Sequence, residues 1–248
     1  MVDTNTDAIS DDEVNELLSR LLNLDERANS LVGRIALTTA RSIIEGRLPP
    51  EYDLNSMDLA KQFQTSRTPI REALMVLEAG GLVGIPARRR PRVTALSTQQ
   101  IREIYSLRAQ LNAVLSDRLA RSITPVELEV LEHTMSRMIS AAERESVDEY
   151  FWANVLFHEQ SARLAGDMTL KKALDGLGIQ VLRLRHTSMS FPGRIERSLE
   201  DHKRLLLAYR ERDAVLASAL SQSNVGSALR VLSEQTTHSY STLPHATT

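Results

Sequence analysis

Hydrophobic positions along this 248-residue chain recur mostly three and four residues apart, which is the period of a helix with one buried face. The first such stripe runs from Val14 to Leu22, behind a capping-box pattern at Ser10 and Glu13. A second runs from Leu31 to Glu45. The polar stretch Met1–Ile9 has no such pattern, and we expect it to be disordered.

The next segment predicts two helices followed by a pair of short strands. Met57–Phe63 predicts a short helix, and a second helix, capped by Ser66 or Thr68, ends at Gly80. Its buried face repeats at helical spacing: Ile70, Ala73, Leu74 and Leu77. The strands, Leu82–Ile85 and Arg92–Leu96, flank an arginine-rich loop. Helix, turn, helix and basic hairpin together describe a winged helix-turn-helix.

The remaining pattern predicts six helices and no strand, which is typical of an antiparallel bundle. The expected helices begin near Ser97, Thr124, Val147, Met168, Arg194 and Asp213, and the fourth runs to His186. The fold class is therefore mainly α: an N-terminal winged helix-turn-helix followed by an antiparallel α-helical bundle. We expect an acidic extension with one helix at 1–29, the DNA-binding unit at 30–96, the all-helical unit at 97–238 and a frayed tail at 239–248.

Charge is unevenly distributed, although the net charge is only −2. Residues 1–30 carry eight acidic and two basic side chains, whereas residues 31–96 carry ten basic and six acidic ones. The second segment therefore supplies the surface that would face a polyanion. Cysteine is absent, which excludes disulfides, thiolate metal sites and a cysteine nucleophile. No apolar run is long enough for a membrane span and no signal-peptide core is evident, so we expect a cytoplasmic protein without membrane contact.

The candidate DNA contacts lie at the start of the second helix of this unit. Arg67 and Arg71 are one turn apart on the face opposite the apolar stripe, beside the hydroxyls of Ser66 and Thr68. Such groups at a helix N-terminus suit phosphates and base edges alike. A surface helix with solvated arginines would show the same spacing, but the surrounding helix, turn and basic hairpin favour DNA binding.

The run SRTPIREAL from Ser66 to Leu74, followed by LEAGGLV, closely resembles the DNA-binding domain of the GntR family of bacterial regulators. The resemblance covers about residues 31–96. It implies that the second helix enters the major groove of a palindromic operator, that the wing lies along the minor groove, and that the protein is a homodimer. The implied DNA-binding residues are Arg34, Ser66, Arg67, Thr68, Arg71, Arg88, Arg89 and Arg90.

The wing departs from the family pattern, because Arg90 stands where the family usually carries a glycine. We therefore expect a different turn at the tip and stronger contact with phosphates or the minor groove.

Fragments of the helical segment resemble the FCD effector domain of the FadR subfamily: Glu103–Arg108, Phe157-His158, Asp201–Leu206 and Arg212–Ala214. The resemblance implies a pocket that holds a divalent metal such as zinc or nickel, and a small carboxylate effector clamped by Arg108. His158 and His202 match two metal positions, while Asn154 and Asn224 stand where the family has Asp and a further His, and Asn112 replaces a common carboxylate. The implied effector-binding residues are thus Arg108, Asn112, Asn154, His158, His202 and Asn224.

Three interpretations of this altered pocket stay open. The metal is lost and these residues hold the effector directly, or a weaker metal persists on His158 and His202 with help from Asn154, Asn224 and an acidic effector. Alternatively, the two histidines are an ordinary buried pair joined by hydrogen bonds.

The leading functional hypothesis is a ligand-responsive transcription regulator, a repressor released by a small organic acid. One alternative is a DNA-binding protein that has lost metal and effector sensing. Another is a histidine-based metal hydrolase, but His158-Glu159 lacks the second histidine of a zincin motif because position 162 is Ala162, so we expect no enzyme. Two interpretations of the N-terminal helix stay open. It docks on the protein body, or it is an acidic arm that competes with DNA or adds dimer contacts.

Overall fold

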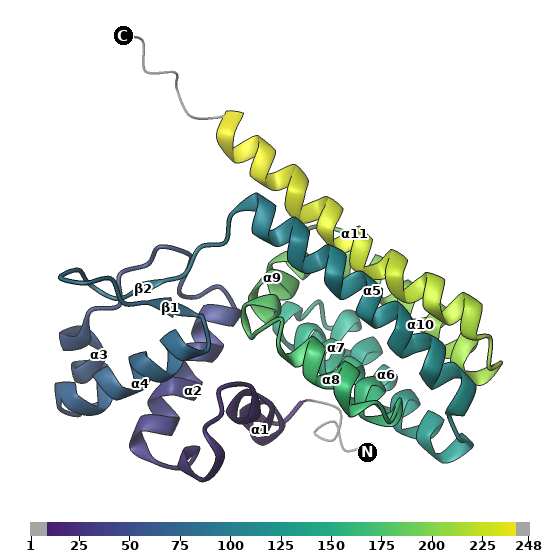
Figure 1. Cartoon of the computed structure of the whole chain (residues 1–248), viewed down its shortest axis with the longest axis horizontal. Helices are drawn as coiled ribbons and strands as arrows, with labels where there is room; N and C mark the ends of the chain where they lie inside the picture. Colours follow the sequence, from purple (N-terminus) through teal and green to yellow (C-terminus); the bar gives the residue numbers. More distant parts are fainter. Residues whose placement is uncertain (1–8, 242–248) are drawn as a thin grey trace.

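The computed structural model describes residues 9–241, with side chains in 9–24 and 26–233. Two units lie side by side, a small winged helix-turn-helix and a larger helical bundle (Figure 1). This arrangement confirms the predicted fold class. The expectations of disorder for residues 1–8 and of a frayed end at 242–248 lie outside the described residues. No helix in the described part of the chain is both long and apolar enough to cross a membrane.

The first unit contains the elements that the hydrophobic pattern predicts. Its helices are α1 (Asp11–Leu21), the short 3₁₀ turn η1 (Asp25–Arg27), α2 (Leu31–Ile44), α3 (Ser56–Gln62) and α4 (Arg67–Ala79). The strands β1 (Val83–Gly84) and β2 (Arg92–Val93) pair antiparallel, with Val83 opposite Val93. Both strands are shorter than expected. On its other edge β2 pairs with the preceding loop, where the Val93 N–H donates to the Tyr52 carbonyl and the Val93 carbonyl accepts from the Glu51 N–H.

The bundle contains seven helices among the described residues: α5 (Thr98–Ser122), α6 (Pro125–Glu143), α7 (Val147–Leu164), α8 (Met168–Asp175), α9 (Gln180–Met189), α10 (Arg194–Arg210) and α11 (Ala214–Ser241). The long helices α5 and α11 pack along each other, and α6 packs on α7 and α10 (Figure 1). Helix α11 extends to Ser241, past residue 239, where the sequence predicted that the frayed tail begins.

The sequence prediction of one helix from Met168 to His186 is wrong, because the chain breaks there into α8 and α9. Gly176 ends α8, and Gly178 adopts a φ of +84°, a left-handed conformation that favours glycine and cannot continue a helix. The break lets α9 leave the direction of α8 and pack against α2 of the DNA-binding unit.

One hydrophobic core joins the two units. Leu17 and Leu18 of α1 and Ile35 of α2 are buried in the same cluster as Trp152 of α7 and Leu182 of α9. In Figure 1, helix α1 lies near the lower edge, between α2 and the helical bundle. The packing of Leu17 and Leu18 in this core corresponds to the first interpretation of the N-terminal helix, docking on the protein body.

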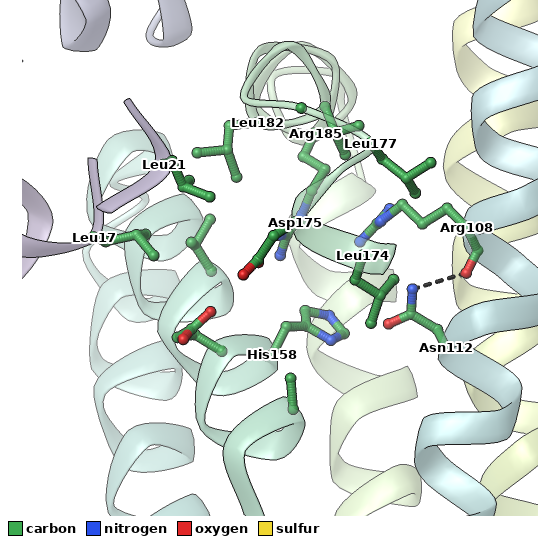
Figure 2. Close-up of a pocket in the computed structure, with 15 residues that line it drawn as sticks. Leu17, Leu21, Arg108, Asn112, His158, Leu174, Asp175, Leu177, Leu182 and Arg185 are labelled. Atoms are coloured by element: carbon green, nitrogen blue, oxygen red, sulfur yellow. Dashed lines mark hydrogen bonds between the residues drawn. The ribbon is translucent and has the colours of Figure 1, made fainter. Parts of the chain in front are cut away.

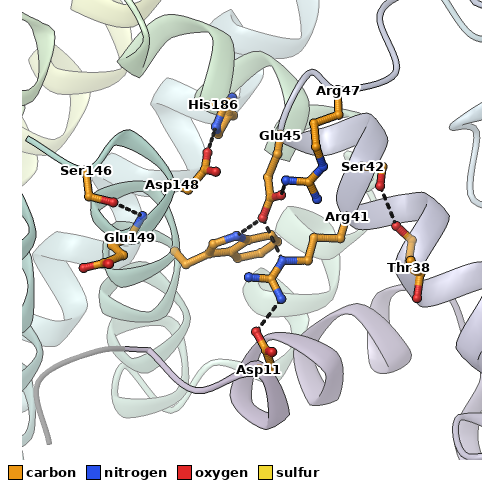
Figure 3. A network of polar contacts seen from close by, with 11 residues as sticks. Asp11, Thr38, Arg41, Ser42, Glu45, Arg47, Ser146, Asp148, Glu149 and His186 are labelled. Carbon is orange, nitrogen blue, oxygen red and sulfur yellow. Dashed lines mark hydrogen bonds and ion pairs between the residues drawn. The ribbon is translucent and has the colours of Figure 1, made fainter. Parts of the chain in front are cut away.

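A buried carboxylate also links the units (Figure 3). Glu45, just after α2, has a side chain that is only 1% exposed. It accepts hydrogen bonds from Trp152 Nε1 of α7 and from Arg41 Nε, both at 2.8 Å, and it forms an ion pair with Arg47. Through these contacts, Glu45 ties the C-terminal end of α2 to Trp152 of α7.

Replacing Glu45 with alanine should destabilise the protein strongly, since the indole N–H and the Arg41 guanidinium would lose a buried acceptor. We expect a loss of about 1–3 kcal/mol in the free energy of unfolding, measured by urea denaturation. Glu132→Ala is the matched control, because Glu132 pairs with Arg210 on the surface and should cost at most about 1 kcal/mol. Equal losses for the two variants would contradict the role of Glu45.

Helix α1 is held to the bundle by a two-pronged ion pair. The Arg137 guanidinium of α6 donates to both oxygens of Glu13, over 2.8 Å and 2.7 Å. Glu13 also accepts from the backbone N–H of Ser10, which completes the predicted capping box. The hydrogen bond from Arg137 lowers the pKa of Glu13 to about 2.

This pKa predicts an acid-sensitive attachment of α1. Because the folded pKa lies below the ordinary value of 4.5, the stabilisation is complete above that value and disappears as the pH falls towards 2. The difference in unfolding free energy between wild type and Glu13→Gln should therefore shrink from pH 6 to pH 3, as followed by urea denaturation. Glu16→Gln, on the exposed face of α1, should show no such trend; a constant Glu13→Gln difference would argue against the ion pair.

Candidate functional site

The predicted DNA-contact residues of α4 all lie on one exposed surface. Ser66, Arg67, Thr68 and Arg71 are exposed, while Ile70, Ala73, Leu74 and Leu77 on the opposite face are buried. Ser66 is the N-cap residue, but its hydroxyl makes no capping hydrogen bond. The first turn of α4 therefore keeps backbone N–H groups and hydroxyls that a phosphate oxygen could accept from.

The wing carries three exposed arginines at its tip, Arg88, Arg89 and Arg90. The tip turns through a hydrogen bond from the Arg89 N–H to the Pro86 carbonyl, and Arg88 has a φ of +62°. The residue of this wing with a left-handed backbone conformation is thus Arg88, and not Arg90, which stands at the position of the family's glycine. No ion pair within the described residues involves these three side chains, and Arg34 of α2 is likewise exposed.

The six predicted effector residues converge around one cavity inside the bundle. Arg108, Asn112 and His158 line its outer lobe, which α1 closes with Leu17 and Leu21 (Figure 2). An inner lobe is lined by Asn154, Asn224, Arg108 and His158. His202 is fully buried behind this wall and contacts both Asn154 and His158.

Two arginines that the sequence analysis missed complete the cavity. Arg185 of α9 lines both lobes, and Arg194 at the start of α10 lines the inner one. Both are as deeply buried as Arg108, with exposed fractions of 7%, 6% and 7% for Arg185, Arg194 and Arg108. The available signal was the alternation of Arg183 and Arg185 with Leu182 and Leu184, which places arginines within an apolar helix.

Arg185 fixes the orientation of Asn154. Its Nη2 donates to both Asn154 Oδ1 and the Asn154 backbone carbonyl. Because a guanidinium only donates, the side-chain oxygen of Asn154 must face Arg185 and its amide nitrogen must face away. That nitrogen lies 3.0 Å from Nε2 of His202.

The two histidines are neutral under ordinary conditions. Burial lowers the pKa of His202 to about 4 and places that of His158 well below its usual value, with Arg185 contributing to both. Nδ1 of His202 lies 2.6 Å from the Ser198 carbonyl, so this nitrogen carries the proton and Nε2 carries the lone pair. Nε2 of His158 lies 3.1 Å from Nε2 of His202, the nitrogen that carries the lone pair.

Positive charge dominates the inner wall. Burial, and next the charge of Arg108, lowers the pKa of Arg185 to about 9, and burial also lowers the pKa of Arg108 and of Arg194. No carboxylate lines the inner lobe, and within the described residues none accepts a hydrogen bond from these three guanidiniums. Asp201 favours the charged form of Arg194 but is not hydrogen-bonded to it. The arrangement can therefore hold an anion.

Family models match both units of the chain. Residues 31–93 match the model described as bacterial regulatory proteins, gntR family, and residues 103–226 match the FCD domain. The chain belongs to the GntR family. This finding confirms the resemblance of both segments, and the chain is a DNA-binding transcription regulator with an FCD domain.

Individual GntR relatives agree with this assignment. The HTH-type transcriptional repressor RspR of Escherichia coli strain K12 is 27% identical over 77% of this chain and 83% of its own length. The gluconate operon transcriptional repressor of Bacillus subtilis strain 168 is 27% identical over 70% of each chain. The solved structure of E. coli McbR/YncC superposes with a TM-score of 0.71 at 20% identity, over 84% of this chain and 99% of that one, which shows the shared fold.

In this GntR-family chain, the cavity shares its walls with the surface that holds the DNA-binding unit. Helix α7 turns Asn154 and His158 to the cavity and Trp152 to Glu45. Helix α9 turns Arg185 to the cavity, while Arg183 donates to the carbonyl of Thr94, just after β2. A change in the cavity can therefore reach the DNA-binding unit through two rigid helices.

The wing geometry predicts a measurable salt effect. The slope of the logarithm of the DNA-binding constant against the logarithm of the salt concentration is negative. Arg90→Gly should reduce its magnitude by about one unit, because one phosphate contact is lost. Fluorescence anisotropy at several salt concentrations measures this slope. Arg90→Lys keeps the charge and should keep the slope. An unchanged slope in Arg90→Gly would mean that this side chain does not reach the backbone of the duplex.

Proposed function

We propose that this protein is a homodimeric repressor that leaves a palindromic operator when a small organic acid enters the bundle cavity. The observation that carries this proposal is the anion-ready inner lobe, lined by Arg108, Arg185 and Arg194, because Arg185 lies on α9, a helix that also packs against the DNA-binding unit. The B. subtilis relative is named for the operon of gluconate, which is itself a carboxylate, and this supports a carboxylate effector.

The DNA contacts follow from the exposed surface of α4 and the wing. Arg67 and Arg71 are free to form bidentate hydrogen bonds with guanine, and Arg88, Arg89 and Arg90 can follow a narrow minor groove. Arg34, Ser66 and Thr68 would contact phosphates. The protein would act by binding, without catalysis: the described residues contain no group of three His, Cys, Asp or Glu that could hold a metal ion, and the zincin motif is missing.

The proposed dimer accounts for exposed apolar side chains on α5. Leu107 and Val114 are 51% and 45% exposed and lie one heptad apart, hence on one face of the helix. A second copy packed there would cover them and would set the spacing between two recognition helices.

Arg71→Ala tests the recognition surface. With a duplex enriched from a random library by the wild-type protein, the variant should lose roughly tenfold to a hundredfold in affinity, since a bidentate contact with guanine contributes about 1–3 kcal/mol. Affinity for a scrambled duplex should change much less. Fluorescence anisotropy measures both, and Arg204→Ala, an exposed arginine of the bundle, is the control. Retained discrimination in Arg71→Ala would remove α4 as the recognition helix.

A further inference from the structure

The effector cavity departs from the metal chemistry that the FCD domain implies. We infer that it binds a small dicarboxylate directly, with the guanidinium of Arg185 supplying the positive charge that a metal ion would otherwise provide. This inference rests on the proposed function, because it names the ligand class and the recognition chemistry of the same cavity.

The donor set does not fit a metal ion. Zinc sites in proteins use three or four strong ligands, usually imidazole, thiolate or carboxylate, and around the inner lobe only His158 and His202 are of this kind. Glu159 and Asp175 of the outer lobe are held in ion pairs, and the described residues contain no group of three such ligands. Asn154 could offer an oxygen, but that oxygen accepts from Arg185. A cation brought to this oxygen would have to displace a guanidinium that is itself a cation.

The hydrogen bonds of the histidines point the same way. The Nε2 lone pair of His202 faces the amide nitrogen of Asn154 at 3.0 Å and His158 Nε2 at 3.1 Å. A metal ion needs this lone pair, whereas both neighbours can donate a proton to it. His202 therefore acts as the acceptor that holds Asn154, and through it Arg185, in position.

The positive groups of the inner lobe lack the partners that buried cations need. Nε and Nη2 of Arg194 are buried and have no hydrogen-bond partner within the described residues, and neither does Ser188 Oγ, which lines the same lobe. The Arg108 guanidinium lies over the Tyr105 ring, 5.6 Å from its centre, with no acceptor among the described residues. Such donors are satisfied by oxygens of a ligand.

The number of charges favours two carboxylates over one. A single carboxylate accepts a bidentate pair from one arginine and leaves the other two without a hydrogen-bonded carboxylate, although the charge of Asp201 favours the charged form of Arg194. A dicarboxylate that spans the inner and outer lobes, which share Arg108 and Arg185 in their walls, gives these guanidiniums an acceptor at each end. The outer lobe shares Arg108 and Arg185 with the inner one, and its two carboxylates, Glu159 and Asp175, are already paired with Arg20 and Lys171.

The first test compares ligands on protein that has been dialysed against EDTA and then against metal-free buffer. Isothermal titration calorimetry should show succinate binding at least tenfold more tightly than butanoate, which has the same carbon chain and one carboxylate fewer. Binding should be unchanged when EDTA is present. If neither succinate nor citrate binds more tightly than butanoate, the arginines do not form a dianion site and the inference fails.

Variants locate the site. Arg185→Met and Arg194→Met should each weaken succinate binding tenfold or more, whereas Arg204→Met, which removes the same charge from the exposed side of α10, should leave it unchanged. Circular dichroism checks the fold of each variant. Two arginines are used so that the loss of one variant to misfolding leaves the other as a test. Wild-type affinity in a folded variant of either arginine would overturn its assigned role.

A gain-of-function variant tests the replacement of metal. Asn154→Asp with Asn224→His and Arg185→Met should take up about one zinc ion per chain, measured by mass spectrometry of the metal, whereas wild type should take up none. Stoichiometric zinc or nickel in wild type, lost in His202→Ala, would overturn the inference. DNA binding by wild type is measured separately with the selected duplex. Its absence would refute the proposed function, whereas metal-dependent succinate binding would refute only this inference.

Discussion

The structure depends on α7 and α9, each of which presents some side chains to the cavity and others to the DNA-binding unit. Residues two apart on a helix point to nearly opposite faces. In α7 this separates Trp152, which meets Glu45, from Asn154, which faces the cavity; in α9 it separates Arg183, which meets Thr94, from Arg185. Neither helix can rotate in response to a ligand without moving its contact on the DNA-binding unit. The burial of Glu45 makes that contact directional, because a displaced Trp152 would leave a buried carboxylate with fewer donors.

The bond between Arg185 and Asn154 then joins the two helices across the cavity. A ligand shifts an equilibrium only by its different affinity for the two states. A ligand carboxylate that accepts hydrogen bonds from Arg185 competes with Asn154 for the same donors. The hydrogen bond of Arg185 to Asn154 and its hydrogen bond to the ligand therefore exclude each other in part. This competition gives the cavity two arrangements, and α1, which closes the outer lobe with Leu17 and Leu21, has to accommodate whichever one is present.

Local features could be predicted from the sequence, and long-range ones could not. The capping box at Ser10 and Glu13 and the helix from Arg194 to Arg210 depend on neighbouring residues, and the structure has both. The break at Gly178 was missed because glycine inside an apolar pattern is tolerated as often as it ends a helix. The fragments that placed Asn154, His158 and His202 came from family resemblance. Arg185 and Arg194 were not part of that resemblance. Only the alternation of arginine with leucine gave a signal for Arg185, and none was available for Arg194, because a buried arginine and a solvated one look alike until the tertiary contacts are known.

The same reasoning explains why the cavity tolerates three buried guanidiniums at all. Burial lowers the pKa of all three, and the charge of Arg108 further lowers that of Arg185, which means that the ligand-free state carries an electrostatic cost. An anion removes that cost when it binds, so part of its affinity comes from relief of repulsion that exists before it arrives. A resident metal ion supplies the same attraction but must itself be acquired and retained. With guanidiniums fixed to α5, α9 and α10, the charge that attracts the ligand is part of the helices that have to move.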